Sequence, residues 1–186
     1  MKLTEKLKTN MKGFTIIEVM IVLAIAGLII AVVLVAVPQL QRNQRNEARR
    51  SILNRIKTEI DNYSGNNQGK YPVQATTDVA GNFGSVTASG TLTSVPAGNS
   101  FVGRYLSGVD VNDPNTGRPG NFTTATGTLL RGDYAADTGY RIVYARSAEC
   151  GTDGTINVLT GSAQSDRKYA LSIGLDGGAA YCIDNK

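Results

Sequence analysis

The sequence predicts an α+β protein in which one long N-terminal α-helix, first transmembrane and then amphipathic, packs on a small antiparallel β-sheet head. An almost uncharged apolar run fills residues 14–37, and apolar residues at helical spacing continue to residue 63. Short β-rich runs separated by turn residues then occupy the last part of the chain. The residues after position 63 are numerous enough to bury a modest core.

Residues 14–38 form the predicted transmembrane segment, which would also be the core of any helical bundle. At about 1.5 Å per residue, the run from Phe14 to Val37 would measure about 36 Å, enough to cross a hydrocarbon core of about 30 Å. Gly27 and Pro38 are the two helix-disfavouring residues of this segment, and Pro38 lacks the N–H that would bond the carbonyl of Leu34. We therefore expect a helix break at Gly27 and Pro38.

Glu18 is the single charged residue of the apolar run. An ionised side chain inside a membrane helix costs about 2.5–3.5 kcal/mol on insertion scales, so a simple anchor would not carry one. Cleavage between Gly13 and Phe14 would create an α-amino group at Phe14. That amine on one subunit could neutralise Glu18 on a neighbour, so Glu18 implies a partner.

The run from Gly13 to Glu18 reads Gly-Phe-Thr-Ile-Ile-Glu and follows a short lysine-rich leader. It resembles the class III signal of type IV pilins and pseudopilins. The resemblance implies the pilin fold, cleavage after Gly13 by a prepilin peptidase, and N-methylation of Phe14. It also implies that Glu18 helps to register subunits in a filament. Pilins often have a helix-breaking proline in this region, and Pro38 lies about one turn later than is common.

Residues 1–13 are predicted to be the cleaved leader, because they are polar and the candidate cleavage site precedes the apolar run. A secretory signal would place its cleavage site after that run. The leader carries four lysines and one glutamate, so the rest of the chain keeps 15 basic and 14 acidic side chains. The high pI therefore belongs largely to the leader, and DNA binding, although open to such a protein, has no support.

Residues 39–63 form the predicted amphipathic helix. Its apolar stripe consists of Ala48, Ile52, Leu53, Ile56, Ile60 and Tyr63. Its opposite face carries Arg49, Arg55, Glu59 and Asp61. The pattern predicts a helix half-buried against a head, with Gly65 as the C-terminal glycine. The polar stretch 39–46 is either a solvated neck or a segment that bonds neighbouring chains.

Residues 64–186 are predicted to form the globular head. Residues 64–100 are rich in Gly, Ser, Thr and Asn and read as a long connecting loop. Tyr71-Pro72 and the turn from Asp113 to Gly117 resemble steps found in pilin heads. A tight hairpin is expected at Asp176-Gly177-Gly178. Strands are predicted at residues 140–144, 155–160, 168–173 and 179–183.

Cys150 and Cys182 are the two cysteines of the chain. Basic residues flank both ends of the span, so charge alone hardly orients it. The leader motif and the cysteine pair favour a cytoplasmic N-terminus and an extracytoplasmic head. Two cysteines in an exported head favour a disulfide over a metal site, with free thiols as the alternative. In many pilins such a bond ties the C-terminal strand to the sheet.

The composition argues against an enzyme. The chain has no histidine, which excludes histidine-based acid–base catalysis and histidine ligands, and it has no phosphate-binding or nucleophile motif. We predict no catalytic residues, no cofactor and no metal. A calcium site was weighed because four oxygen-bearing residues crowd one turn, namely Asp110, Asn112, Asp113 and Asn115. The spacing of an EF-hand fails there, since Pro114 takes the third ligand position.

These observations predict a type IV pilin precursor that polymerises with copies of itself into an extracytoplasmic filament. The implied partners are a prepilin peptidase, an assembly ATPase, an inner-membrane platform protein, and the membrane before assembly. Twitching motility, adhesion, DNA uptake and secretion are the tasks open to such a filament. The alternatives are a pseudopilin of a type II secretion or DNA-uptake system and a membrane-tethered binding domain that never polymerises.

Overall fold

The computed structural model describes residues 13–73, 75, 80–81, 83–84, 98–117, 121–124, 141–163 and 165–186. Contacts divide the chain into two compact units, Met1–Gln41 and Arg42–Lys186. The leader before Gly13, most of the expected loop between residues 74 and 97, and Tyr140 lie outside the described residues.

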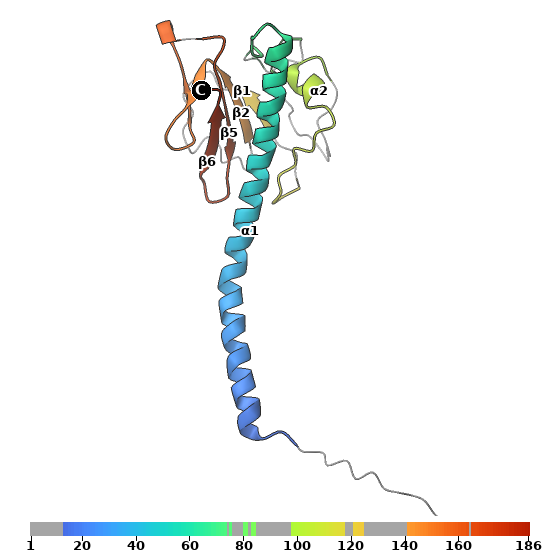
Figure 1. Ribbon diagram of the computed structural model, residues 1–186, viewed down its shortest axis with the longest axis vertical. Helices are drawn as coiled ribbons and strands as arrows, with labels where there is room; N and C mark the ends of the chain where they lie inside the picture. Colours follow the sequence, from blue (N-terminus) through green and yellow to red (C-terminus); the bar gives the residue numbers. More distant parts are fainter. Residues whose placement is uncertain are drawn as a thin grey trace, which may run out of the picture. The chain divides into compact units, whose positions relative to one another are not determined.

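Helix α1 runs from Ile16 to Asn66 as one α-helix (Figure 1). The predicted transmembrane and amphipathic stretches are therefore parts of a single element, which confirms the long N-terminal helix. The expected break is not present in the single chain, because α1 continues through both Gly27 and Pro38. A break at these two residues stays a prediction for the assembled state, where neighbouring chains surround the helix.

The end of α1 lies three residues beyond the expected end at Tyr63, and Gly65 is inside the helix. The chain leaves α1 through Gln68 and Gly69, whose φ angles are 58° and 78°. The Gly69 N–H donates to the carbonyl of Ser64 at 2.9 Å. This bond makes Gln68 the left-handed residue that ends the helix and Gly69 the residue after it, so the expected role of Gly65 as the C-terminal glycine is wrong.

The main sheet of the head has the strand order β1-β2-β5-β6 (Figure 1). Its strands are β1 (Asn121–Thr124), β2 (Arg141–Arg146), β5 (Tyr169–Gly174) and β6 (Ala180–Asp184). Strands β2, β5 and β6 pair antiparallel, as predicted, whereas β1 pairs parallel to β2. The sheet is therefore mostly antiparallel, and β1 corrects the expectation of a purely antiparallel one.

Three short elements complete the described head. Strands β3 (Ala148–Cys150) and β4 (Ile156–Val158) form a separate antiparallel pair, so the predicted strand at 155–160 exists but lies outside the main sheet. Helix α2 (Phe101–Tyr105) follows the N-cap Ser100, whose Oγ accepts the Gly103 N–H. A 3-10 turn occupies Gly161–Ala163.

The larger core lies between α1 and the main sheet. Leu53, Ile56 and Ile60 of α1 are fully buried there, which confirms the predicted apolar stripe. They belong to the same cluster as side chains from α2 and its C-cap Leu106 and from alternate positions of β2 and β5. These partners include Phe101, Leu106, Ile142, Tyr144, Tyr169, Leu171 and Ile173.

A smaller core lies on the opposite face of the sheet. The intervening residues of the central strands, Val143, Ala145 and Ala170, pack there with Ala148 of β3 and Ile156 of β4. Successive residues of a strand point to opposite faces, so both faces of β2 and β5 are covered. This explains why the sequence of β2 shows only a partial alternation of apolar and polar residues.

Candidate functional site

The first part of α1 exposes apolar side chains throughout its length. Ile16 is 82% exposed, Leu34 is 70% exposed, and the large apolar residues between them are exposed as well, as is Phe14 just before the helix. Among the described residues, α1 is the one helix that is long and apolar enough to cross a membrane. A continuous apolar surface of this kind implies a membrane or other apolar helices as its environment.

A capping box starts α1 and uses the predicted site residue Glu18. The Thr15 N–H and the Thr15 hydroxyl both donate to Glu18 Oε2 at 2.8 Å. In return, the Glu18 N–H donates to Thr15 Oγ1 at 3.3 Å. These bonds satisfy N–H groups that would otherwise lack partners at a helix N-terminus. The Thr-x-x-Glu spacing is the sequence signature of this motif.

The predicted cleavage site lies just outside the helix. Gly13 and Phe14 precede Ile16 and are not helical, and a side chain at Gly13 would meet nothing within 4 Å. Phe14 and Val19 line one open hollow together with Glu18. These two apolar residues occupy the N′ and N4 positions of a hydrophobic staple, which fixes how the chain enters the helix. The Gly13–Phe14 bond therefore lies just before the helix, next to the staple, and its cleavage stays a prediction.

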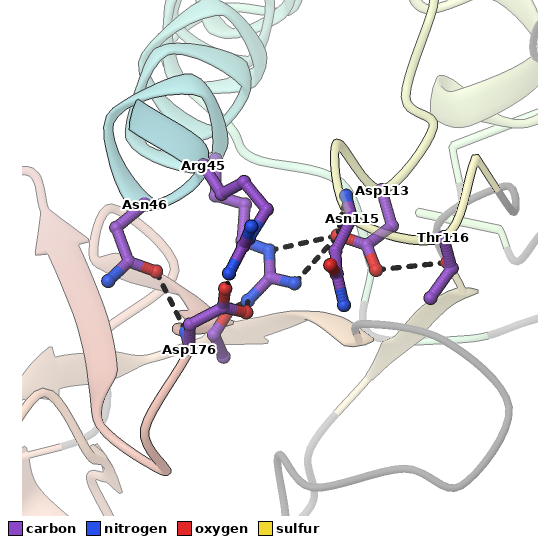
Figure 2. A network of polar contacts seen from close by, with 8 residues as sticks. Arg45, Asn46, Asp113, Asn115, Thr116 and Asp176 are labelled. Carbon is purple, nitrogen blue, oxygen red and sulfur yellow. Dashed lines mark hydrogen bonds and ion pairs between the residues drawn. The ribbon is translucent and has the colours of Figure 1, made fainter. Parts of the chain in front are cut away.

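A second cluster of charged residues ties α1 to two turns of the head (Figure 2). Arg49 donates to Asp113 Oδ1 from Nη2 at 2.6 Å and from Nε at 3.1 Å. Its Nη1 pairs with Asp176 Oδ1 at 2.8 Å and donates to the Gly174 carbonyl at 3.3 Å. Arg49 is only 5% exposed, so its predicted place on the solvent face was wrong.

Two more residues of α1 bind the turn between β5 and β6. Arg45 pairs with Asp176 Oδ2 at 2.6 Å, and the Asn46 amide oxygen accepts the Asp176 N–H at 2.7 Å (Figure 2). Burial alone would raise the pKa of Asp176. The hydrogen bonds and charges of Arg45 and Arg49 outweigh burial, however, and hold the pKa of this carboxyl below its usual value. This end of the polar stretch 39–46 thus bonds its own head.

The turn at residues 110–115, considered above as a calcium site, binds an arginine. The two bonds that Arg49 makes to Asp113 both end on Oδ1, which also accepts the Asn115 N–H at 3.3 Å. The other oxygen of Asp113, Oδ2, accepts the Thr116 hydroxyl at 3.0 Å. Asp110 bonds locally, accepting the Asn112 N–H at 2.9 Å. The cation that the Asp113 carboxylate neutralises is therefore the guanidinium of Arg49.

Cys150 and Cys182 form a disulfide, as predicted. The bond joins the end of β3 to β6, and the Cys150 N–H donates to Asp184 Oδ2 on the same strand at 2.9 Å. The small β3–β4 pair is thus fastened to the edge of the main sheet. The expected link between the C-terminal strand and the rest of the head is confirmed.

Comparison with known proteins identifies the N-terminal segment. Residues 8–34 match the family described as the prokaryotic N-terminal methylation motif, and the match includes Gly13, Phe14 and Glu18. This motif is the class III signal peptide of type IV pilins and pseudopilins. No curated protein and no solved structure matches the chain.

Proposed function

We propose that this chain is a type IV pilin precursor, the structural subunit of an extracytoplasmic filament. The methylation motif supports a type IV pilin or pseudopilin precursor as a class. The step from that class to a pilus subunit is our proposal. In it, a prepilin peptidase cleaves between Gly13 and Phe14, Phe14 is N-methylated, and mature chains polymerise with one another.

The observation that carries the proposal is the contrast between an apolar helix with exposed side chains and a head that buries its own core. Burying apolar surface is favourable by about 25 cal/mol per Å², so the exposed part of α1 needs an apolar environment. A membrane supplies it before assembly, and a bundle of identical helices supplies it afterwards. The role proposed for this chain is therefore assembly and not catalysis.

The proposed topology rests on the leader motif and on the cysteine pair. The span residues 14–38 cross the inner membrane before assembly, with the head outside the cytoplasm, where a disulfide between Cys150 and Cys182 would persist. Extraction of the helix from the membrane and its addition to a filament require work. An assembly ATPase acting through a membrane platform protein is the class of machinery that would supply it.

The test is to shear surface filaments from cells and measure the intact mass of the subunit. We expect long fibres whose subunit begins at a methylated Phe14. A Gly13→Val variant should retain residues 1–13 and form no fibres, because the basic leader cannot enter an apolar bundle. Among the described residues, a Cβ at Gly13 would meet nothing within 4 Å, so we expect this change to leave the fold intact.

Other outcomes would assign other functions. A cleaved chain that remains in the membrane fraction, without long fibres, would favour a pseudopilin of a secretion or DNA-uptake system. A chain that stays monomeric in detergent extracts, with its leader present or absent, would favour a tethered binding domain. Fibres built from subunits that keep residues 1–13 would contradict the proposed processing.

A further inference from the structure

Thr15 determines the direction in which the Glu18 carboxylate points. Its N–H and its hydroxyl both bond the same oxygen, Oε2, at 2.8 Å, and its Oγ1 accepts the Glu18 N–H. With two donors on one oxygen, the carboxylate is folded back toward the start of α1. None of the three bonds uses Oε1, so that oxygen can accept a further donor.

The folded-back carboxylate lies beside the atom that cleavage would make charged. Successive backbone nitrogens are at most about 3.6 Å apart, given the standard bond lengths along the chain. Glu18 Oε2 lies 2.8 Å from the Thr15 nitrogen. The Phe14 nitrogen is therefore within about 6.4 Å of that oxygen. Cleavage after Gly13 would thus place a protonated amine and a carboxylate at the same end of the helix.

We infer that Thr15 is a positioning residue for the Glu18 carboxylate in assembly, an inference that rests on the proposed pilin function. Thr15 holds Oε2 and thereby presents Oε1 to the Phe14 amine of a second copy of this chain. An N-methylated α-amine has two N–H donors and one positive charge, which matches one carboxylate oxygen that is still open. The charge pair forms without further ordering of the glutamate, because Thr15 has already fixed its rotamer.

Thr15 could favour assembly through its apolar surface or through its hydroxyl, and these two roles predict opposite effects of the same substitution. Valine has the shape of threonine and is more apolar, so a purely hydrophobic role at this position predicts that Thr15→Val assembles at least as well as the parent. Loss of the hydroxyl removes one bond to Oε2 and the acceptor for the Glu18 N–H. The positioning role therefore predicts the opposite sign, and Thr15→Ser should restore the parent behaviour.

The experiment is a co-assembly competition in cells that express the parent chain and one variant together. The ratio of variant to parent in sheared filaments, divided by their ratio in the membrane, is measured by mass spectrometry of the N-terminal peptides. Removing an N-cap hydroxyl corresponds to roughly a fivefold change in an equilibrium. We expect Thr15→Val to fall about fivefold in this ratio and Thr15→Ser to stay within about twofold of the parent.

A double-mutant cycle shows whether Thr15 acts through Glu18. The background is Glu18→Gln, which is expected to be milder than loss of the side chain and so keeps incorporation measurable. There, Thr15→Val should cause a smaller decrease than in the parent, because a neutral amide forms no charge pair for Thr15 to position. An equal decrease in both backgrounds would overturn the inference, as would parent-like incorporation of Thr15→Val. The parent chain reports on the proposed function separately, since it must itself appear in filaments.

A second measurement does not depend on filaments. In detergent micelles, the full chain should show slowed amide hydrogen exchange at Glu18, whose N–H donates to Thr15 Oγ1. Thr15→Val should speed that exchange, and Thr15→Ser should not. Unchanged exchange in Thr15→Val would overturn the inference even if filaments form. The remaining outcome combines faster exchange in Thr15→Val with a parent chain that forms no filaments. That result would overturn the proposed function and, with it, the role of Thr15 in assembly.

Discussion

Two leucines of the same helix show how differently the two parts of α1 are used. Leu34 is 70% exposed, whereas Leu53 is fully buried against α2 and the main sheet. The charges differ in the same way. Arg49 is neutralised within its own chain by Asp113 and Asp176, whereas Glu18 is bonded only locally, by Thr15.

The difference teaches which contacts the chain supplies for itself. From Arg45 onward, α1 has its apolar stripe covered and its buried charges paired by the head. Before Gln41, the described helix has neither cover nor counter-charge. The same hydrophobic effect acts on both parts, so the uncovered part must be satisfied by lipid or by other chains. Variants of matched chemistry in the two parts should therefore have opposite consequences for folding and assembly.

The largest effect on folding is expected from Arg49→Met. The substitution keeps most of the apolar stem but leaves the buried Asp113 carboxylate without its counter-charge and Asp176 with Arg45 alone. Breaking a buried pair in this way typically costs about 3–5 kcal/mol. Urea unfolding of the full chain in detergent should show this loss, while membrane insertion is unchanged. Arg55→Met, on the exposed side of the same helix, should stay within about 0.5 kcal/mol of the parent. Similar stabilities for the two variants would refute the ion-pair account of the head.

The next effect separates the two leucines. Leu53→Ala should destabilise the head by about 2–5 kcal/mol, because it leaves a cavity in the larger core. Leu34→Ala removes the same atoms from an exposed position and should leave urea unfolding of the head unchanged. Leu34→Ala should instead lower the filament yield, since the lost apolar surface belongs to the proposed bundle. An equal loss of head stability in both variants would erase the distinction between the two parts of α1.

A pair of glycines gives a smaller effect of opposite sign. Gly154 has a φ of 74°, and a Cβ there would overlap the carbonyl oxygen of Ala180. Gly154→Ala should therefore cost about 1–3 kcal/mol of head stability. At Gly27 a Cβ would meet nothing within 4 Å. Gly27→Ala should leave the stability of the head unchanged and stabilise the helix by about 0.5–1 kcal/mol, which circular dichroism on heating would detect. A milder effect at Gly154 than at Gly27 would contradict the packing described for β6.

The smallest effect concerns pH. The pKa of Asp176 is lowered in the folded chain, despite its burial, by Arg45 and Arg49. A lowered folded pKa gives stability that is complete above the unfolded value of about 3.9 and is lost as pH falls through the folded value. Unfolding midpoints measured from pH 6 down to pH 2 should therefore decrease for the parent. Asp176→Asn should show a weaker decrease, and an identical pH profile would show that this carboxylate is not part of the charge network.

The sequence predicts those features that depend on local pattern. The apolar run, the helical stripe ending near Tyr63 and the turn at Asp176-Gly177 all follow from residues close together in the chain. The β5–β6 hairpin follows from its local turn signal. The disulfide joins residues 32 apart and was predicted on another ground, namely that the chain has just two cysteines and both lie in a head expected to be exported. Most of the fold and the N-terminal part of the candidate site could be found in this way.

The features that the sequence analysis missed depend on pairing across long separations. Strand β1 pairs with β2 some twenty residues away, and its four residues have no pattern that marks a parallel partner. Arg49 lies on the face of α1 where solvent was expected, and only the distant Asp113 and Asp176 make its burial favourable. The capping box differs from these long-range features, because Thr15 and Glu18 are only three residues apart and their spacing alone predicts the motif.

The most direct test of the central claim is the Glu18→Val variant of the full chain, followed through insertion, cleavage and assembly. It should accumulate in the membrane and be cleaved normally, since removing a charge eases insertion. It should yield few or no filaments, because each neighbouring Phe14 amine would lack its counter-charge, at about 3–5 kcal/mol for each subunit. Glu18→Gln should be milder, and Glu47→Val, which removes an exposed carboxylate from the same helix, should assemble like the parent. Parent-level filament yield from Glu18→Val would contradict the account.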